Sequence, residues 1–136
     1  MKINLLKSGK KKGLIFIAVL ILSLIITVSI GIWVRETDAI YIAVAGPMSG
    51  EYELSGEKML RGTQMYVDEV NKAGGANGKK IKLLIFDDEG KAELAKEKAK
   101  EIVEETPAIA VVGHYFSGTS IATKEIYDRA GMAALT

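Results

Sequence analysis

The chain has no cysteine, one histidine and only two prolines among its 136 residues. The lack of cysteine excludes a disulfide framework and a lipid-attachment cysteine. His114 is the only imidazole, and no His-Glu-x-x-His pattern occurs, so the ligand sets that hold zinc are missing as well. The sequence therefore indicates a domain that works without a cofactor or a metal ion.

Charge is missing from residues 13–34, a run of 22 residues that follows five lysines, and no acidic residue precedes Glu36. At about 1.5 Å of rise per residue, such a run can cross a membrane as a helix. The lysines favour a cytoplasmic N-terminus. We predict a cytoplasmic basic tip (1–12), a transmembrane helix or signal anchor (13–34), a linker (35–39) and a periplasmic or extracellular domain (40–136).

A cleaved signal peptide is the alternative to this anchor. Its apolar region is usually shorter and is followed by small residues at the cleavage site. Ser29-Ile30-Gly31 fits such a site poorly, and Thr37-Asp38-Ala39 lies beyond charged residues. We therefore expect the anchor to remain uncleaved.

The residues that follow the uncharged run are mildly acidic. They include 13 basic and 17 acidic side chains, which gives a net charge of −4. Proteins that bind nucleic acids usually carry a basic face or stripe. The charge of this domain argues against a nucleic acid partner.

Strand-like and helix-like segments alternate after residue 39. β-branched and apolar runs predict strands, and amphipathic runs predict helices. Right-handed crossovers between such elements give a parallel sheet with helices on both faces, in the strand order 2-1-3-4. The expected elements are strands at 40–45, 80–86, 108–113 and 132–135, and helices at 56–72, 91–105 and 117–130. The fold class is α/β, and because the chain stops at its fourth strand we expect an incomplete domain.

A hydroxyl-rich turn follows the third expected strand. Ser117, Gly118, Thr119 and Ser120 open the next helix. A helix N-terminus at the carboxyl end of a parallel strand is a common anion site, because backbone N–H groups point at the ligand there. Helix capping by these hydroxyls is the structural interpretation, and the two roles are compatible.

The loop after the first strand, at 46–50, is neither a P-loop nor a dinucleotide fingerprint, because its glycine spacing and ending differ. Strands one and three are neighbours in the expected order. We therefore expect Ser49, Tyr52 or Ser55 to line the same crevice as Ser117, with Ser55 also able to cap the first helix.

Two further groups are interpreted structurally. His114 has no identifiable nucleophile or acid partner in the sequence, so we expect it to support the turn. Asp87-Asp88-Glu89 follows the second strand. Acidic residues there usually form a turn and cap the next helix, and we prefer this to a divalent cation site.

Several short motifs follow one another along the domain. They are Val44-Ala45-Gly46-Pro47-Met48-Ser49-Gly50, Gly56-Glu57, Arg61-Gly62, Val70-Asn71-Lys72-Ala73-Gly74-Gly75-Ala76-Asn77-Gly78, Asp87-Asp88, Val111-Val112-Gly113-His114, Ser117 to Ser120, Ile126-Tyr127 and Ala130-Gly131. With this order and spacing, residues 40–136 resemble the N-terminal lobe of the leucine/isoleucine/valine-binding proteins. These are type I periplasmic binding proteins that serve ABC importers.

The resemblance implies two α/β lobes that close over a small ligand, often an amino acid, of which this chain would hold part of one. It implies that Ser117 binds the ligand's carboxylate and that Thr119 assists. An aromatic residue of the family that covers the ligand is replaced here by Ser55, with Tyr52 nearby. Gly118 stands where serine is common, and Gly90 and Phe116 replace two cysteines that several members pair.

The function predicted from this resemblance is binding of an amino acid or similar ligand as the component that delivers substrate to an ABC permease. The alternative is an extracellular sensing domain of a receptor such as a histidine kinase. An enzyme with Ser117 as nucleophile ranks third, because no Gly-x-Ser-x-Gly elbow is present.

Overall fold

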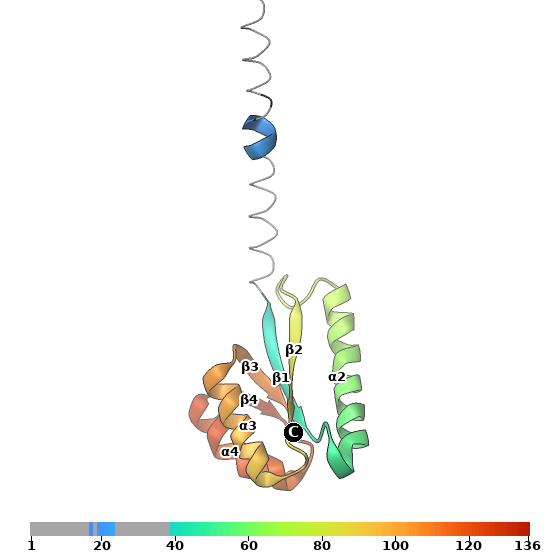
Figure 1. Cartoon of the computed structure of the whole chain (residues 1–136), viewed down its shortest axis with the longest axis vertical. Helices are drawn as coiled ribbons and strands as arrows, with labels where there is room; N and C mark the ends of the chain where they lie inside the picture. Colours follow the sequence, from blue (N-terminus) through green and yellow to red (C-terminus); the bar gives the residue numbers. More distant parts are fainter. Residues whose placement is uncertain (1–16, 18, 24–38) are drawn as a thin grey trace, which may run out of the picture. The chain divides into compact units, whose positions relative to one another are not determined.

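The computed structural model describes residues 17, 19–23 and 39–136. The chain divides into two units, 1–38 and 39–136, and the second is the α/β domain of Figure 1. Most of the predicted membrane helix, the predicted tip and most of the linker lie outside the described residues; residues 17 and 19–23 are helical. None of the helices described here combines the length and the apolar character that a membrane span requires.

A four-stranded parallel sheet in the order β2-β1-β3-β4 forms the centre of the domain. β1 (Ile40–Gly46) lies between β2 (Ile81–Asp87) and β3 (Ala108–Val112), and β4 (Ala133–Leu135) pairs with β3. The predicted order and direction are confirmed. All strands end at one edge of the sheet, the lower end of the domain in Figure 1, where the end of the chain also lies.

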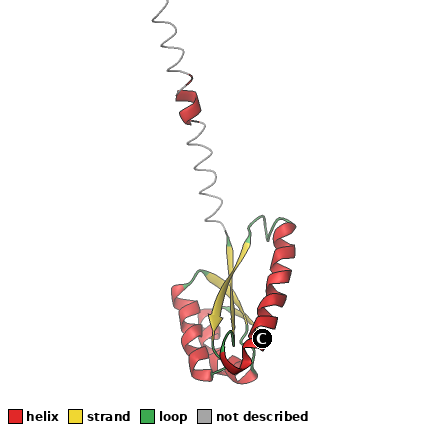
Figure 2. Cartoon of the chain, turned by 45° about the vertical axis from the view of Figure 1, so that its right-hand side comes forward, coloured by secondary structure: helices red, strands yellow, loops and turns green. Residues whose placement is uncertain are grey.

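Helices cover both faces of this sheet, as predicted. α2 (Glu53–Lys72) lies on one face, and α3 (Ala92–Glu105) and α4 (Ser117–Ala130) lie side by side on the other (Figures 1 and 2). Burial in the middle of β1 explains its continuous apolar sequence, since Ala43 and Val44 are completely shielded from solvent.

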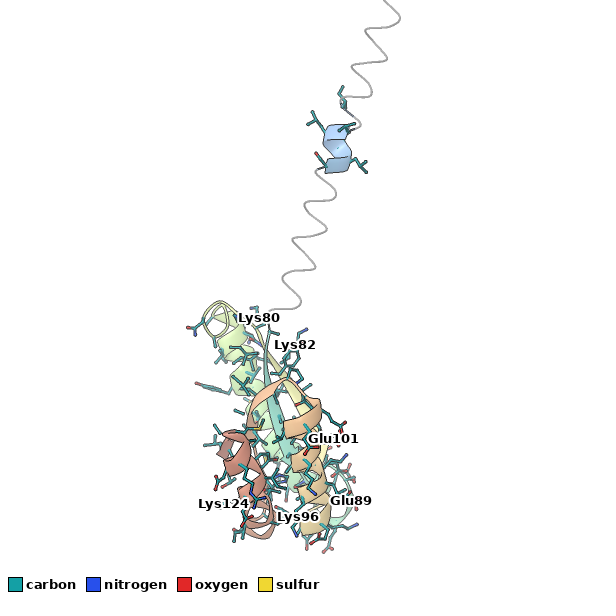
Figure 3. All side chains as sticks on the ribbon, turned by 90° about the vertical axis from the view of Figure 1, so that its left-hand side faces the viewer. Lys80, Lys82, Glu89, Lys96, Glu101 and Lys124 are labelled. Atoms are coloured by element: carbon teal, nitrogen blue, oxygen red, sulfur yellow. The ribbon has the colours of Figure 1, made fainter. Side chains whose placement is uncertain are left out.

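The main hydrophobic core lies between the sheet and the α3/α4 pair. Phe86 of β2 packs there with Ile102 of α3 and Tyr127 of α4. The outer surfaces of the two helices are charged, and Figure 3 shows Lys96 and Lys124 on this side of the domain. These lysines form ion pairs one helical turn away, which contribute little to stability because they are exposed.

α2 begins earlier than the sequence predicted. A short 3-10 helix, η1 (Gly50–Tyr52), leads directly into it, so the helix starts at Glu53 instead of Gly56. The prediction that Ser55 caps this helix is wrong, because Tyr52 occupies the cap position and no side chain caps the helix. Gly56 packs tightly on the preceding loop: a Cβ there would lie 2.0 Å from the carbonyl oxygen of Pro47.

A single asparagine joins the end of α2 to the start of β2. The Asn71 side chain accepts a hydrogen bond from the N–H of Ile81 and donates one to its carbonyl, both at 2.8 Å. The chain between them turns through glycines with positive φ, as predicted; a Cβ on Gly75 would lie 2.0 Å from the carbonyl oxygen of Lys79. This connection fixes the end of α2 against the start of β2, one of the two edge strands of the described sheet.

Candidate functional site

β3 leaves the sheet at a glycine where no side chain fits. Gly113 has a φ of +124°, and a Cβ there would lie 1.9 Å from the carbonyl oxygen of Ala45 in β1. The N–H of Gly113 donates to the carbonyl of Leu135 in β4 at 2.8 Å. The start of the turn is therefore held by both neighbouring strands, which places the following residues at the carboxyl edge of the sheet.

α4 starts at Ser117, as predicted, but its cap differs from the structural interpretation of the hydroxyl-rich turn. Phe116 occupies the cap position in an extended conformation, and no side chain caps the helix. The first helical hydrogen bond runs from the N–H of Ser120 to the carbonyl of Phe116 at 2.9 Å. The N–H groups of Ser117, Gly118 and Thr119 come before it and have no acceptor within the helix.

The hydroxyls of this turn divide into two groups. Thr119 is buried and donates to the carbonyl of Phe116 at 2.7 Å, and Ser120 donates to the carbonyl of His114 at 2.9 Å. Ser117 is exposed, and its hydroxyl has no hydrogen-bond partner among the described residues. Gly118 is exposed too, and a Cβ there would meet no atom within 4 Å. Ser117 is thus the hydroxyl that remains available at the uncapped helix start.

A hollow of about 310 Å³ opens beside Ser117. It lies between the ends of β3 and β4 and the first turn of α4. Neither the loop after β1 nor the start of α2 contributes to it, so Ser49, Tyr52 and Ser55 do not line it. Its lining residues are His114, Tyr115, Ser117, Ser120, Ile121 and Thr136.

The segment after β1 does approach the turn after β3, through aromatic rings that meet edge to face. The ring of Tyr52 meets that of Phe116 edge to face, with centroids 4.8 Å apart, and Phe116 meets Tyr115 in the same way at 5.0 Å. Gly90 lies beneath them, since a Cβ there would come within 3.2 Å of both Tyr52 and Phe116. The two loops that were expected to share a crevice are therefore in contact, with side chains filling the corner between them.

The other two polar residues that were expected in this crevice lie elsewhere. Ser49 donates its hydroxyl to Asp87 at the end of β2. Ser55 is half-buried in the first turn of α2. The structure thus keeps Ser117, Gly118 and Thr119 together, sets Tyr52 beside the same turn, and directs Ser49 toward β2.

His114 has the structural role that the sequence predicted. Its side chain is completely buried; Nδ1 lies 2.6 Å from Asp88 Oδ2 and Nε2 lies 3.0 Å from the hydroxyl of Tyr127. Burial, together with the negative charge of Asp88, raises the pKa of the Tyr127 hydroxyl. The three side chains connect the turns after β2 and β3 to α4.

The acidic residues after β2 form a turn, as predicted. Asp87 accepts hydrogen bonds from the N–H groups of Glu89 and Met48 at 2.9 and 2.8 Å, and Asp88 accepts one from the N–H of Gly90 at 2.8 Å. Burial raises the pKa of Asp87, but hydrogen bonds from Ser49 and these N–H groups outweigh it and lower the pKa. The expected capping of the next helix is wrong, because Lys91 precedes α3 and no side chain caps it.

Sequence reasoning missed three lining residues of the hollow: Tyr115, Ile121 and Thr136. Tyr115 and Thr136 follow the ends of β3 and β4, so the expected strand order contained the signal that would have found them. The partnership of His114 with Asp88 and Tyr127 depends on contacts between distant segments, and no local pattern indicates it.

Comparison with known proteins places this geometry in a family. The family model described as periplasmic binding protein matches residues 39–136. An amino acid binding protein of Pseudomonas aeruginosa is 39% identical over 116 residues, which cover 85% of this chain and 31% of that protein. A leucine-, isoleucine-, valine-, threonine- and alanine-binding protein of the same organism is 33% identical over 99 residues, covering 73% of this chain and 26% of the relative.

Solved structures agree with these matches. The branched-chain amino acid transporter substrate-binding protein LivJ of Streptococcus pneumoniae, in complex with isoleucine, has a TM-score of 0.66 and 29% identity, over 72% of this chain and 30% of that one. An ABC transporter substrate-binding protein of Desulfitobacterium hafniense, in complex with Leu, has a TM-score of 0.61 and 32% identity, over 71% of this chain and 28% of that one.

This chain spans about a third or less of the length of these relatives. The match nevertheless runs through every strand and helix of the domain, including the turn that carries Ser117. The chain belongs to the periplasmic binding proteins, and within them to the type I proteins of the leucine/isoleucine/valine-binding family.

Proposed function

We propose that residues 39–136 form one wall of a binding site for an amino acid or a similar small ligand. In this proposal the protein is the substrate-binding component of an ABC importer of the branched-chain amino acid type, and its partner is the permease. The relatives support this assignment, since they are named as amino acid binding proteins and as substrate-binding proteins of transporters.

The observation that carries the proposal is the exposed Ser117 hydroxyl at the uncapped start of α4. A carboxylate placed there would accept hydrogen bonds from this hydroxyl and from free backbone N–H groups, and the helix dipole would favour its charge. Gly118 leaves space for a close approach. Thr119 would contribute its N–H group, because its hydroxyl already donates to Phe116.

We assign the ligand's side chain to the aromatic surface next to this turn. Tyr52 is 42% exposed and lies against Phe116, so its free face can cover an apolar group. Ser55, where the family commonly has an aromatic residue, would contribute less contact area. The ligand preference would therefore depend on Tyr52 more than on Ser55.

The location of this protein follows from the same proposal. The domain acts in the periplasm or outside the cell, and residues 13–34 hold it to the membrane with the N-terminus in the cytoplasm. The uncharged run and its five preceding lysines support the anchor. Alkaline extraction of membranes tests it: an anchored chain stays in the pellet, whereas a chain released by cleavage appears in the supernatant.

A direct test of the site is an NMR titration of the isotope-labelled chain with L-leucine. One wall of a two-lobed site buries little of the ligand, so we expect millimolar binding or weaker for this chain alone. Chemical shift changes should centre on the amides of Ser117, Gly118 and Thr119. Isopentylamine, which lacks the carboxylate, should leave these amides unmoved.

Substitutions complete the test. Ser117→Ala removes a hydrogen bond to a charged group, about 1.5–3 kcal/mol, and should abolish the leucine-induced shifts. Thr63→Ala changes a hydroxyl on α2 that donates within its own helix, and should leave the shifts intact. Leucine-induced shifts that persist in Ser117→Ala would remove Ser117 from the site.

The alternative function is a sensing domain of a membrane receptor, which the uncharged run at 13–34 favours because a receptor must stay in the membrane. Sequencing of the surrounding DNA separates the two functions. Neighbouring permease and ATPase genes support import, whereas a second membrane span joined to a kinase supports sensing.

A further inference from the structure

Three buried side chains from three different segments form one hydrogen-bonded chain beneath the Ser117 turn. Asp88 comes from the turn after β2, His114 from the turn after β3, and Tyr127 from α4. Asp88 and His114 have no exposed side-chain surface, and Tyr127 is 2% exposed. Groups buried this completely hold one geometry, because breaking either hydrogen bond would leave a polar atom without a partner.

The donor and acceptor capacities of the three groups favour one arrangement of the protons. An ionised carboxylate can only accept, so Asp88 receives the proton of His114 Nδ1. If the imidazole is neutral, Nε2 is then the acceptor and the hydroxyl of Tyr127 donates to it. Burial and the charge of Asp88 raise the pKa of Tyr127, so the hydroxyl keeps its proton near neutral pH.

The same chain of contacts continues into the backbone of the site. The carbonyl of His114 accepts the hydroxyl of Ser120 at 2.9 Å, which ties the residue before the turn to the first turn of α4. Ser117 lies between these two attachment points. Its position therefore depends on where the His114 residue is held.

Asp88 connects this arrangement to the neighbouring strands. Its N–H donates to the carbonyl of Gly46, the last residue of β1, at 3.0 Å. Its second carboxylate oxygen accepts from the N–H of Gly90, the residue beneath the Tyr52 and Phe116 rings, at 2.8 Å. One residue thus contacts segments that follow or end β1, β2 and β3.

We infer that Asp88 and Tyr127 are positioning residues of the Ser117 site, which act by fixing the ring of His114 and, through it, the direction of the Ser117 hydroxyl and the first N–H groups of α4. The inference rests on the proposed function of Ser117 in ligand binding. The competing interpretation is that the three side chains only stabilise the core.

The first experiment uses Tyr127→Phe in the isotope-labelled chain, with Tyr66→Phe as the matched control, because Tyr66 is 74% exposed on α2. The NMR chemical shifts of the ring nitrogens report the tautomer of His114. The backbone amide shifts report the conformation of the turn at Ser117. We expect a proton on Nδ1 in the unsubstituted chain. In Tyr127→Phe we expect moved amides at Ser117 and Gly118 and about 2- to 10-fold weaker leucine binding, as for one lost hydrogen bond. Tyr66→Phe should change neither.

The second experiment uses Asp88→Asn. The new amide can donate to Nδ1, so we expect the proton of His114 to move to Nε2 and the Ser117 and Gly118 amides to shift again. Circular dichroism checks that each variant is folded; if Asp88→Asn does not fold, Tyr127→Phe decides alone. The inference is overturned if the folded variants alter the His114 ring while the Ser117 and Gly118 amides and the leucine affinity stay unchanged.

The two proposals fail in different ways. If Ser117→Ala binds leucine like the unsubstituted chain, the proposed function of Ser117 fails. The effect of Asp88 and Tyr127 on the turn is still measured in the ligand-free protein, because the His114 tautomer and the amide shifts of Ser117 and Gly118 can be observed without a ligand.

Discussion

Two turns leave the same edge of the sheet and use their polar groups in opposite ways. Three carboxylates lie at the end of β2 and in the turn that follows it, and all three have partners: Asp87 and Asp88 accept hydrogen bonds from surrounding backbone and side-chain groups, and Glu89 pairs with Lys91. The turn after β3 leaves the Ser117 hydroxyl and the start of α4 without partners among the described residues. We call the first turn saturated, because its carboxylates all have partners, and the second unsaturated.

This difference separates a supporting turn from a candidate binding turn. A polar group that is satisfied internally gains little from a ligand, because binding would have to break an existing hydrogen bond. An exposed hydroxyl beside free N–H groups has only water to displace. Charge alone would have favoured the acidic turn as the site, whereas the pattern of hydrogen bonds favours the turn at Ser117.

The largest expected effect comes from Gly113, which places the unsaturated turn against β1. Gly113→Ala would put a Cβ 1.9 Å from the Ala45 oxygen at a φ of +124°. We expect a loss of about 3 kcal/mol or more, or failure to fold, measured by thermal unfolding. Gly118→Ala is the control, because its Cβ would enter open space, and it should be neutral or slightly stabilising. Equal melting temperatures for both variants would contradict the tight contact with β1.

The next effect comes from the saturated turn. Asp87→Asn removes the charge that three hydrogen bonds stabilise, which should cost about 1–2 kcal/mol at pH 7. The folded pKa of Asp87 lies below its ordinary value of 3.8, so its contribution to stability is fully present above that value and is lost as the pH falls from there through the folded pKa. Urea unfolding should show that the difference in free energy of unfolding between the unsubstituted protein and Asp87→Asn becomes smaller as the pH falls from 7 to 3. A difference that stays constant with pH would contradict the stabilising role of the Asp87 charge.

A smaller effect is expected from the hydroxyl that the second turn does use. Ser120→Ala removes the hydrogen bond to the His114 carbonyl at 2.9 Å. The expected loss is about 1 kcal/mol, read from the urea midpoint at constant slope. An unchanged midpoint would mean that Ser120 is as free as Ser117, and the division of the hydroxyls into two groups would be wrong.

The smallest effect is expected at Ser117. Because its hydroxyl has no partner among the described residues, Ser117→Ala should change the free energy of unfolding by less than about 0.5 kcal/mol. Unfolding of this variant beside Ser120→Ala gives the sharpest comparison within the turn. A clear destabilisation would show that Ser117 has a structural partner and weaken its assignment to a ligand.

The sheet order and the start of α4 were predictable because they follow from local signals. Alternating apolar and amphipathic runs define the elements, and short connections fix the crossovers. The start of α2 was missed because Gly50 and the following residues form a 3-10 helix, which the glycine-rich loop does not reveal. Tyr52 thereby takes the cap position that the sequence assigned to Ser55.

The position of the candidate turn was predictable, but its contacts were not. The sequence pattern placed Ser117, Gly118 and Thr119 at the carboxyl edge of the sheet, where the structure has them, since parallel strands end together. It could not show that Thr119 would donate to its own turn, because that choice depends on the extended backbone at Phe116. It also could not place Tyr52 on Phe116, a contact between segments more than 60 residues apart.

The asparagine at the end of α2 has a consequence for solubility. β2 is one of the two edge strands of the described sheet, and unpaired edges invite strands from other molecules. The Asn71 side chain occupies both backbone groups of Ile81, the first residue of β2, so these groups cannot pair with a strand of another molecule. A strand that paired at this point would first have to displace the Asn71 side chain, so a side-chain amide protects the start of this edge from intermolecular pairing.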